Sequence, residues 1–419
     1  MVFTEVTIGD LGQIITGTTP PTSKTELFGN EFPFITPTDI DGVNRTVVTE
    51  RGLSKQGYNY QPRYLLPPNS VCVVCIGATI GKMCITSEPS FTNQQINSIV
   101  VDIDNYDPFF VFYLLRLQSD RIRAVSGGAA TPIVNKTVFS DIGVNVPPLP
   151  TQHKIASILS AYDDLIENNT HRIKILEEMA QSLYREWFVN FRFPSYEKIR
   201  MVDSNLGKIP VGWLEKLVDH VDYLEGPGIR NWQYRQEGIP FLNIRTLISN
   251  DIALTKVNYL DEDEVNTKYL HFLLRPYDHV VSSSGTLGRL VTVQSIHLPL
   301  MLNTSIIRMR PKSDRAPRWL LKHFLLSDYY QNQINALATG VAQKNYGPAH
   351  LKQMWIVVPD EDIARKYEAL VEPIEEMILE LVQKNRLLRQ IRDLLLPRLI
   401  SGELDVSDLG IVINDNGGN

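Results

Sequence analysis

Cysteine is scarce in this chain of 419 residues, which has only Cys72, Cys75 and Cys84. An odd number of cysteines grouped in one segment does not build a disulfide framework. Cys72 and Cys75 form a C-x-x-C pair, but the surrounding "NSVCVVCIG" is typical of a buried strand. Residues three apart on a strand point to opposite faces. We therefore expect these thiols to be structural, with metal or redox use as the less favoured alternative.

Long apolar runs and an excess of basic residues are also lacking. No stretch approaches the ~18 apolar residues that span a bilayer, and "MVFTEVTIGDLG" has no signal-peptide pattern, so we expect a cytoplasmic protein with no membrane partner. Lysine and arginine total 41 against 47 acidic residues, a net charge of −6. Free-standing nucleic-acid binders are usually basic. DNA binding would therefore need local clusters of cations, or a partner that neutralises part of the phosphate charge.

Motifs for catalysis are missing as well. "GATIGK" is one residue short of a phosphate-binding P-loop, and no G-x-G-x-x-G follows a strand. "DPFF" (Asp107–Phe110) distantly resembles the Asp-Pro-Pro-Phe of amino-methyltransferases, but its second copy is "APRW" without the acid, which indicates a helix start. No His, Cys or Asp group has metal-ligand spacing. The sequence thus predicts a chain with no catalytic residues and no metal site.

What the chain does contain is a tandem duplication of a whole module. "FPFITPTDI" from residue 32 returns as "IPFLNIRTL" from residue 239, and "TNQQINSIVV" from residue 92 returns as "LNTSIIRM" from residue 302. Matching positions lie about 210 residues apart, in the same order. Each copy combines short β runs and turn signals with a helix. We expect a mixed α/β (α+β) fold with a pseudo-two-fold internal repeat.

A long amphipathic helix follows each module. Apolar positions recur from Ile155 to Trp187 at alternating steps of four and three, interrupted by Asn169, and again from Tyr367 onward, interrupted by Asn385. This spacing is a heptad seam, and a helix of ~50 Å needs a partner for its apolar stripe. We expect the two helices to pair as an antiparallel coiled coil. Facing residue numbers should then sum to about 554, which places Asn169 opposite Asn385 and Trp187 opposite Tyr367.

Three segments make the sequence resemble one family. "VPPLPTQHKIASILSAYDDLIENNTHRIKILEEMAQSLYREWFVNF" resembles the central conserved region of the DNA-specificity subunit of type I restriction–modification systems. "LLLPRLISGELDV" is similar to its distal conserved region, and "GKIPVGW" to the usual start of its second target-recognition domain. The first module lacks such a Pro-x-Gly-Trp start, so its edge should be built differently. The resemblance implies target-recognition domains at 1–150 and 196–360, and conserved helical regions at 151–195 and 361–419.

The family resemblance also implies a function. Each target-recognition domain would read one half of an asymmetric bipartite site in double-stranded DNA. The helices would act as a spacer and as the docking surface for two modification (methyltransferase) subunits, which restriction (translocase/nuclease) subunits join. Adenine-N6 methylation, cleavage and the use of S-adenosylmethionine, ATP and Mg would belong to these partners, so this chain needs no cofactor. Alternatives are a methyltransferase or nuclease in its own right, a non-catalytic tandem binding scaffold, and the specificity subunit of a modification-only system.

Polar residues of the repeated loops are the candidates for DNA contact. Arg and Lys can contact guanine or phosphate, and Asn and Gln can pair with adenine. In the first module the candidates are Thr36, Thr38, Lys82, Asn93, Gln94, Asn135 and Lys136, and in the second Asn243, Arg245, Arg289, Asn303, Gln343, Lys344 and Asn345. Both modules contain a similar tetrad, "TIGK" (Thr79–Lys82) and "TLGR" (Thr286–Arg289), which is typical of a hairpin turn or of a loop presented to a phosphate. The aromatic helix end with Trp187, Phe188 and Phe191 should pack on the second module or bind a partner subunit.

Overall fold

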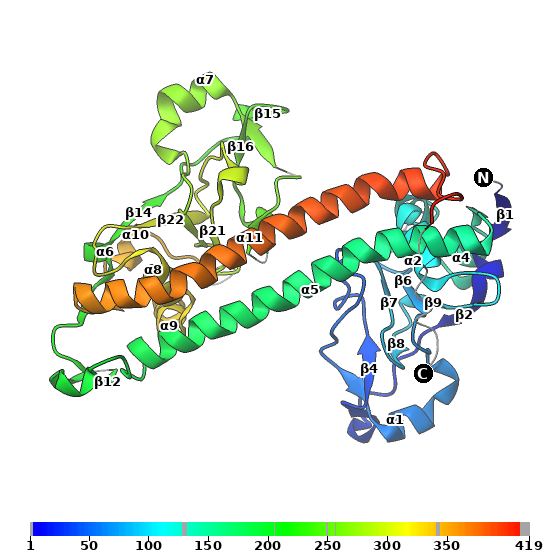
Figure 1. The fold of residues 1–419 in the computed structure, drawn as a ribbon, viewed down its shortest axis with the longest axis horizontal. Helices are drawn as coiled ribbons and strands as arrows, with labels where there is room; N and C mark the ends of the chain where they lie inside the picture. Colours follow the sequence, from blue (N-terminus) through cyan, green and yellow to red (C-terminus); the bar gives the residue numbers. More distant parts are fainter. Residues whose placement is uncertain are drawn as a thin grey trace. The chain divides into compact units, whose positions relative to one another are not determined.

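The computed structural model describes residues 3–127, 132–204, 206–248, 250–255, 257–340 and 344–410. Its contacts divide the chain into two units, unit 1 with residues 1–168 and 385–419 and unit 2 with residues 169–384. The division falls inside both long helices, α5 (Leu149–Phe188) and α11 (Glu361–Ile400) (Figure 1). Each unit therefore holds one module and a segment of each helix, whereas the sequence suggested a separate region for each helix.

Unit 1 is built around a four-stranded antiparallel sheet with the strand order β2-β9-β6-β7. Its inner strands are mostly apolar, and their side chains enter core clusters on both faces of the sheet. The other sheets of the unit are the pair β1-β10 and a second four-stranded sheet of very short strands, β3-β5-β4-β8. The elements are β1 (Thr4–Thr7), β2 (Gly12–Thr16), β3 (Phe28–Gly29), β4 (Phe32–Ile35), β5 (Gly52–Leu53), α1 (Lys55–Tyr60), β6 (Val71–Val74), β7 (Met83–Ile85), β8 (Phe91–Thr92), β9 (Ile96–Val101), α2 (Pro108–Leu117), α3 (Ser119–Ala124), α4 (Lys136–Ser140) and β10 (Gly143–Val146).

Unit 2 repeats this plan. Its central sheet has the order β14-β22-β20-β21, and the β13-β23 pair corresponds to β1-β10. The predicted duplication of a whole mixed module is therefore confirmed. The elements are β11 (Met201–Ser204), β12 (Gly207–Pro210), β13 (Leu214–Lys216), α6 (Leu217–His220), β14 (Val221–Glu225), β15 (Tyr234–Arg235), β16 (Ile239–Phe241), β17 (Leu247–Ile248), β18 (Asp251–Ile252), β19 (Asn258–Leu260), α7 (Glu262–Glu264), β20 (His279–Ser282), β21 (Leu290–Thr292), β22 (Ile306–Pro311), α8 (Arg318–Leu326), α9 (Asp328–Leu337), α10 (Pro348–Leu351) and β23 (Trp355–Val357).

Two local expectations can be compared with unit 1 directly. The Asp107 carboxylate accepts a hydrogen bond from the backbone N–H of Phe110 at 2.8 Å, so "DPFF" caps the start of α2. Cys72 and Cys75 are both buried, and they belong to different core clusters. The two thiols therefore lie on opposite faces of the sheet, as the strand interpretation predicts. Within the described ranges, no group of three or more His, Cys, Asp or Glu could hold a metal ion.

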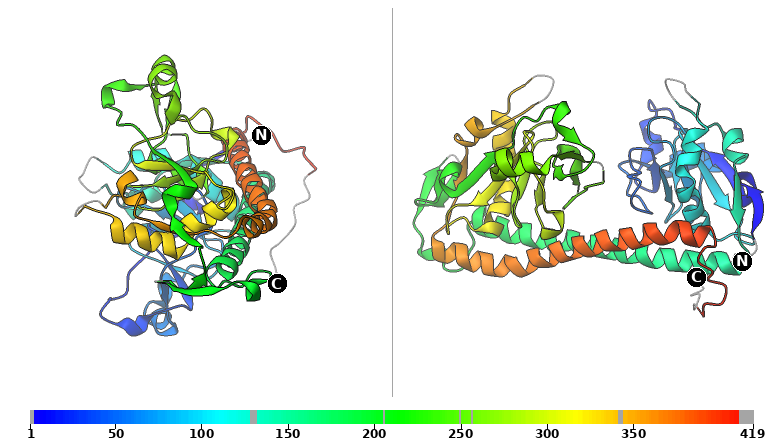
Figure 2. Two further views of the ribbon diagram at one scale, coloured as in Figure 1. Left: turned by 90° about the vertical axis from the view of Figure 1, so that its left-hand side faces the viewer. Right: turned by 90° about the horizontal axis from the view of Figure 1, so that it is seen from above.

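The helical segments run antiparallel within each unit (Figure 2, right). In unit 1, Ile155 and Leu159 share a core cluster with Leu396 and Leu399. In unit 2, Ile173 packs in one cluster with Leu381, and the rings of Trp187 and Tyr367 have centroids 5.6 Å apart. The predicted contact between Trp187 and Tyr367 is thus confirmed, and the pairing of Asn169 with Asn385 stays a prediction. Among the described residues, no helix combines the length and apolar character that crossing a membrane requires.

A buried carboxylate occupies the same position on both helices. Asp163 of α5 accepts a 2.5 Å hydrogen bond from the hydroxyl of Tyr113 on α2 and pairs with Arg392 of α11. Glu375, its counterpart on α11, pairs with Lys322 of α8 and lies 2.7 Å from Nε2 of His323. Each module is therefore tied to its helix by a desolvated acid. In unit 1 the cation comes from the other long helix, and in unit 2 it comes from the module itself.

Candidate nucleic-acid interface

In module one, four polar segments meet at one edge of the central sheet. The loop after β2 joins the turn before β9 through a 3.1 Å hydrogen bond from Gly17 N to Ile96 O. The end of β6 contacts the same turn, because Cys75 N donates to Gln95 O at 2.8 Å. The segment before α4 completes the group, with Val134 N donating to Cys75 O at 2.8 Å. These are the segments from which several of the candidate residues come.

A glycine at a matching position makes this convergence possible in both modules. A Cβ on Gly17 would stand 2.3 Å from the backbone oxygens of Thr92 and Asn93, and one on Gly226 would stand 2.4 Å from the backbone of Asn303. Only glycine allows the chain to cross the turn at this distance. The sequence analysis missed both residues, although a glycine directly after the first strand of each central sheet was a detectable signal.

Asn93 and Asn303 shape the turn that this glycine crosses. The Asn93 side-chain oxygen accepts a hydrogen bond from Gln95 N at 3.0 Å, and the Asn303 oxygen accepts one from Ser305 N at 2.9 Å. Both are Asx turns, in which an asparagine side chain binds the backbone two residues on. Gln94 is exposed beside the buried Asn93, and its side-chain oxygen accepts a hydrogen bond from the Thr19 hydroxyl at 2.7 Å.

Three further candidates also form hydrogen bonds within their own loops. The Asn135 side-chain oxygen caps α4 by accepting from Val138 N at 2.9 Å, and that of Asn243 accepts from Arg245 N at 2.9 Å. Thr36 donates its hydroxyl to the Asp39 carboxylate at 2.7 Å. Thr36 also contacts the hydroxyl of the exposed Thr38 at 2.8 Å. These contacts fix the shape of the loops. The residues next to them in the loops are therefore better placed to contact DNA.

The candidate cations fall into two groups. Lys82 and Arg289, at matching positions, donate to the carbonyl oxygens of Ile40 at 3.1 Å and Leu247 at 2.9 Å, so each ties its hairpin to a neighbouring segment. The exposed group consists of Lys136, Arg245 and Lys344. Asn345 is exposed and exchanges two backbone hydrogen bonds with Thr339 at 2.8 and 2.9 Å. Gln343 lies outside the described residues.

Exposed aromatic side chains beside cations were not anticipated from the sequence. Trp232 of module two is 74% exposed and stands between the exposed Arg230 and Arg235. Its neighbour Gln233 is buried and donates to the Glu264 carboxylate at 3.1 Å, which anchors the turn. In module one the Lys24 ammonium lies 5.0 Å from the ring centre of the exposed Tyr60. The signal in the sequence is the segment "RNWQYR", which has no copy in module one.

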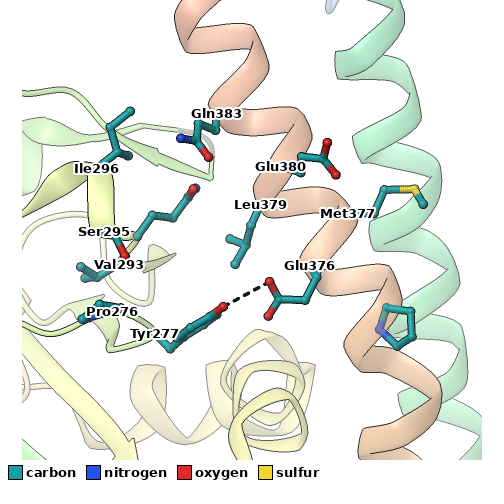
Figure 3. Close-up of a pocket in the computed structure, with 12 residues that line it drawn as sticks. Pro276, Tyr277, Val293, Ser295, Ile296, Glu376, Met377, Leu379, Glu380 and Gln383 are labelled. Carbon is teal, nitrogen blue, oxygen red and sulfur yellow. Dashed lines mark hydrogen bonds between the residues drawn. The ribbon is translucent and has the colours of Figure 1, made fainter.

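Two of the hollows on the surface of unit 2 lie next to the segments described above. One, of about 380 Å³, lies among the converging polar loops and is lined by Glu225, Ser283, Ser284, Thr304, Ser305, Asn345, Tyr346, Gly347, Pro348, Ala349 and His350. The other, of about 460 Å³, lies between module two and α11. In this second hollow Tyr277 points toward Glu376 and donates its hydroxyl to the carboxylate at 3.2 Å (Figure 3). The loop hollow is polar, whereas the helix-side hollow also presents Met377 and Leu379.

The aromatic end of α5 lies in the core of unit 2. Trp187, Phe188 and Phe191 are each no more than 8% exposed and belong to one cluster with Trp213 and Tyr367. The rings of Phe188 and Tyr367 form a T-shaped pair with centroids 4.8 Å apart, and the rings of Phe191 and Trp213 form another with centroids 6.2 Å apart. Their burial favours the intramolecular alternative over the partner-binding role assigned to these three residues.

Comparisons with known proteins agree on one family. A family model described as "Type I restriction modification DNA specificity domain" matches residues 2–178. The type I restriction enzyme MjaIX specificity subunit of Methanocaldococcus jannaschii is 25% identical over 96% of this chain and 93% of its own length. The HindI specificity subunit of Haemophilus influenzae is 36% identical over 41% of this chain and 38% of its own.

A solved structure shares the fold. The crystal structure of a type I restriction–modification S subunit from M. genitalium aligns with a TM-score of 0.58 at 16% identity and covers 95% of this chain and 96% of that chain. The duplicated module, the paired long helices and the family model lead to one conclusion. Residues 2–178 match the DNA specificity domain of type I restriction–modification systems, and nearly the whole chain is similar to the specificity subunits of those systems.

Proposed function

We propose that each module reads one half of an asymmetric bipartite DNA sequence. The observation that supports this best is a shared scaffold with different exposed residues. Both modules have the same sheet order and the same Asx turn crossed by a glycine. On its loops module one presents the exposed Gln94 and Lys136, whereas module two presents the exposed Trp232 and Arg245. Phosphate contacts place such loops on the duplex, and the side chains at base edges select the sequence.

We further propose that two methyltransferase subunits dock on the long helices, one for each copy of the repeat. Large apolar side chains are exposed at matching positions of the two helices. In unit 1 these are Leu165, 54% exposed, and Leu387, 56% exposed, and in unit 2 they are Met377, 42%, and Ile175, 44%. Because these exposed apolar side chains recur at matching positions of both helices, they are suited to contact two copies of one binding partner.

The partner subunits would also carry the chemistry and part of the charge. Methylation of adenine N6 with S-adenosylmethionine, and cleavage with ATP and Mg by restriction subunits, would take place on those partners in the cytoplasm. Because this chain has a net charge of −6, methyltransferases closing around the duplex would supply many of the phosphate-neutralising cations. Binding to DNA should consequently be tighter and more salt-dependent in the complex than for the isolated chain.

Exchange of module two tests the division of labour. Replacing residues 205–360 with the corresponding module of a relative should change one half of the methylated sequence and leave the other half intact, because each module carries its own loops. The measurement is a genome-wide map of methylated adenines in cells that express the assembled complex. A change in both halves would show that the modules do not read independently.

Replacement of Trp232 by alanine should weaken the binding of specific DNA by about 5- to 150-fold, which corresponds to the ~1–3 kcal/mol that one lost base position costs in a duplex site. Trp355→Ala is the matched control, because Trp355 is also exposed and lies beneath the Lys216 ammonium, but it belongs to β23 and not to the loops. Affinity is measured by titration of labelled duplex with the assembled complex. Equal losses in the two variants would argue against a DNA contact by Trp232.

A further inference from the structure

Glu225 occupies a fixed position at the loop edge of module two. It is the last residue of β14 and pairs with Ile307 of β22. The next residue, Gly226, packs directly on the backbone of Asn303. The backbone that carries this carboxylate is therefore held by the sheet on one side and by the Asx turn on the other.

The carboxylate faces the polar loop hollow, whose walls are also fixed. Ser283 N donates to Ser305 O at 2.8 Å, and Tyr346 N donates to Ser283 O at 3.0 Å, so the three wall segments are hydrogen-bonded to one another. A Cβ on Gly347 would stand 3.7 and 3.8 Å from the two carboxylate oxygens, in van der Waals contact with both. Gly347 thus leaves room beside the acid that any other residue would occupy. Burial raises the pKa of Glu225.

Module one has no equivalent of this acid. Its first central strand ends at Thr16, directly before Gly17, and the Thr16 hydroxyl donates to Asn97 of the neighbouring strand at 2.7 Å. In module two the residue opposite Glu225 is Ile307, whose side chain offers no hydrogen bond. The acid is therefore a feature of one copy only, as expected of a residue that distinguishes two half-sites.

A carboxylate at this place is suited to one kind of DNA contact. The described residues that line the hollow include no lysine or arginine. Phosphates repel a carboxylate, so Glu225 would not serve as a backbone contact. The donors that duplex DNA offers are the exocyclic amino groups of its bases, on cytosine and adenine in the major groove and on guanine in the minor groove.

We propose that Glu225 is a base-reading residue of module two that accepts a hydrogen bond from the exocyclic amino group of one base in its half-site. The inference rests on the proposed function of module two as the reader of that half-site. The serine and threonine hydroxyls of the hollow surround the base edge, and Gly347 keeps the approach open. A base with a carbonyl in place of the amino group leaves the carboxylate without a donor and is rejected.

The test is Glu225→Gln in the full chain assembled with its methyltransferase partners. A glutamine can both donate and accept, so the preference at one position of the module-two half-site should fall by about tenfold or more. The gap and the module-one half-site should stay unchanged. The readout is the map of methylated sites, together with competition between duplexes that differ at single positions. Glu237→Gln, an exposed acid of the same module, is the control and should leave the map unchanged.

A second variant guards against a folding artefact. Gly347→Ala keeps the carboxylate but places a methyl group in van der Waals contact with both of its oxygens, in the space through which the base would approach, and it should weaken the preference at the same position. Unchanged preference in both variants would overturn the role of Glu225. If module exchange alters its half-site while Glu225→Gln does not, only the base-reading inference fails. If module exchange alters neither half-site, the proposed function itself fails.

Discussion

Replacing Glu375 by alanine should lower the free energy of unfolding by about 3–5 kcal/mol, the cost of breaking a buried ion pair by removing one partner. The Glu375 side chain is 1% exposed, and it pairs with Lys322, which is 4% exposed, and with His323, which is 1% exposed. His323 in turn hydrogen-bonds through Nδ1 to the Tyr367 hydroxyl at 2.7 Å. Loss of the carboxylate would leave the Lys322 ammonium buried without a counter-charge.

Chemical denaturation of the full chain, followed by circular dichroism, measures this cost. Glu380→Ala is the control on the same helix, because Glu380 and its partner Lys384 are both largely exposed, and such pairs contribute about 0–1 kcal/mol. If the two substitutions lowered the free energy of unfolding by similar amounts, the buried contacts of Glu375 with Lys322 and His323 would contribute no more than an exposed ion pair.

The pH dependence gives an independent signature of the same acid. Burial opposes ionisation of Glu375, but Lys322 and His323 outweigh it and lower the pKa to about 2, from an ordinary value of 4.5. A lowered folded-state pKa stabilises the fold above pH 4.5, and this contribution is lost as the pH falls toward 2. The stability gap between wild type and Glu375→Ala should therefore narrow over that interval.

Removing one facing heptad from each long helix should shorten the gap in the recognised DNA by about three base pairs. Residues 170–176 of α5 and 378–384 of α11 face each other in the predicted register. Seven residues correspond to ~10 Å of helix, and B-DNA rises ~3.4 Å per base pair. The seam stays in phase because the deletion is one heptad, and the modules turn by only ~20° relative to it. Both half-site sequences should persist.

Mapping of methylated sites gives the result directly. Deletion of three residues from each helix is the control, because it takes the apolar stripes out of phase and should abolish assembly instead of resetting the gap. A seven-residue variant that assembles and methylates DNA with the original gap would show that the helices do not determine the spacing.

Repetition in the sequence revealed the scaffold better than the interface. The matching segments predicted the duplicated module, and the apolar steps predicted the contact between Trp187 and Tyr367, because packing at a fixed period leaves a trace in composition. The same reliance on repeats led to Asn93, Asn135, Asn243 and Asn303, whose side-chain oxygens cap backbone N–H groups. Polar residues that recur in both modules therefore maintain the loop conformation that the two modules share.

Residues of the opposite kind escaped the sequence analysis. Glu225 and Trp232 occur in one module only, and their placement depends on contacts between segments distant in the chain. Gly226 on the turn at Asn303 and Gln233 on Glu264 are such contacts. No local sequence pattern predicts these contacts. The side chains that they orient therefore could not be identified as DNA-contact candidates from the sequence.

The two buried acids, Asp163 and Glu375, should make replacement of the first module easier than replacement of the second. The cation that pairs with Asp163 is Arg392 of α11, so the charge of Asp163 is already balanced by the long helices when a different first module is introduced. Around Glu375 the cation, Lys322, departs with the second module. A foreign second module that lacks a basic residue at the position of Lys322 would leave the Glu375 carboxylate buried without a counter-charge. Recombination should therefore renew the first half of the recognition sequence more freely than the second.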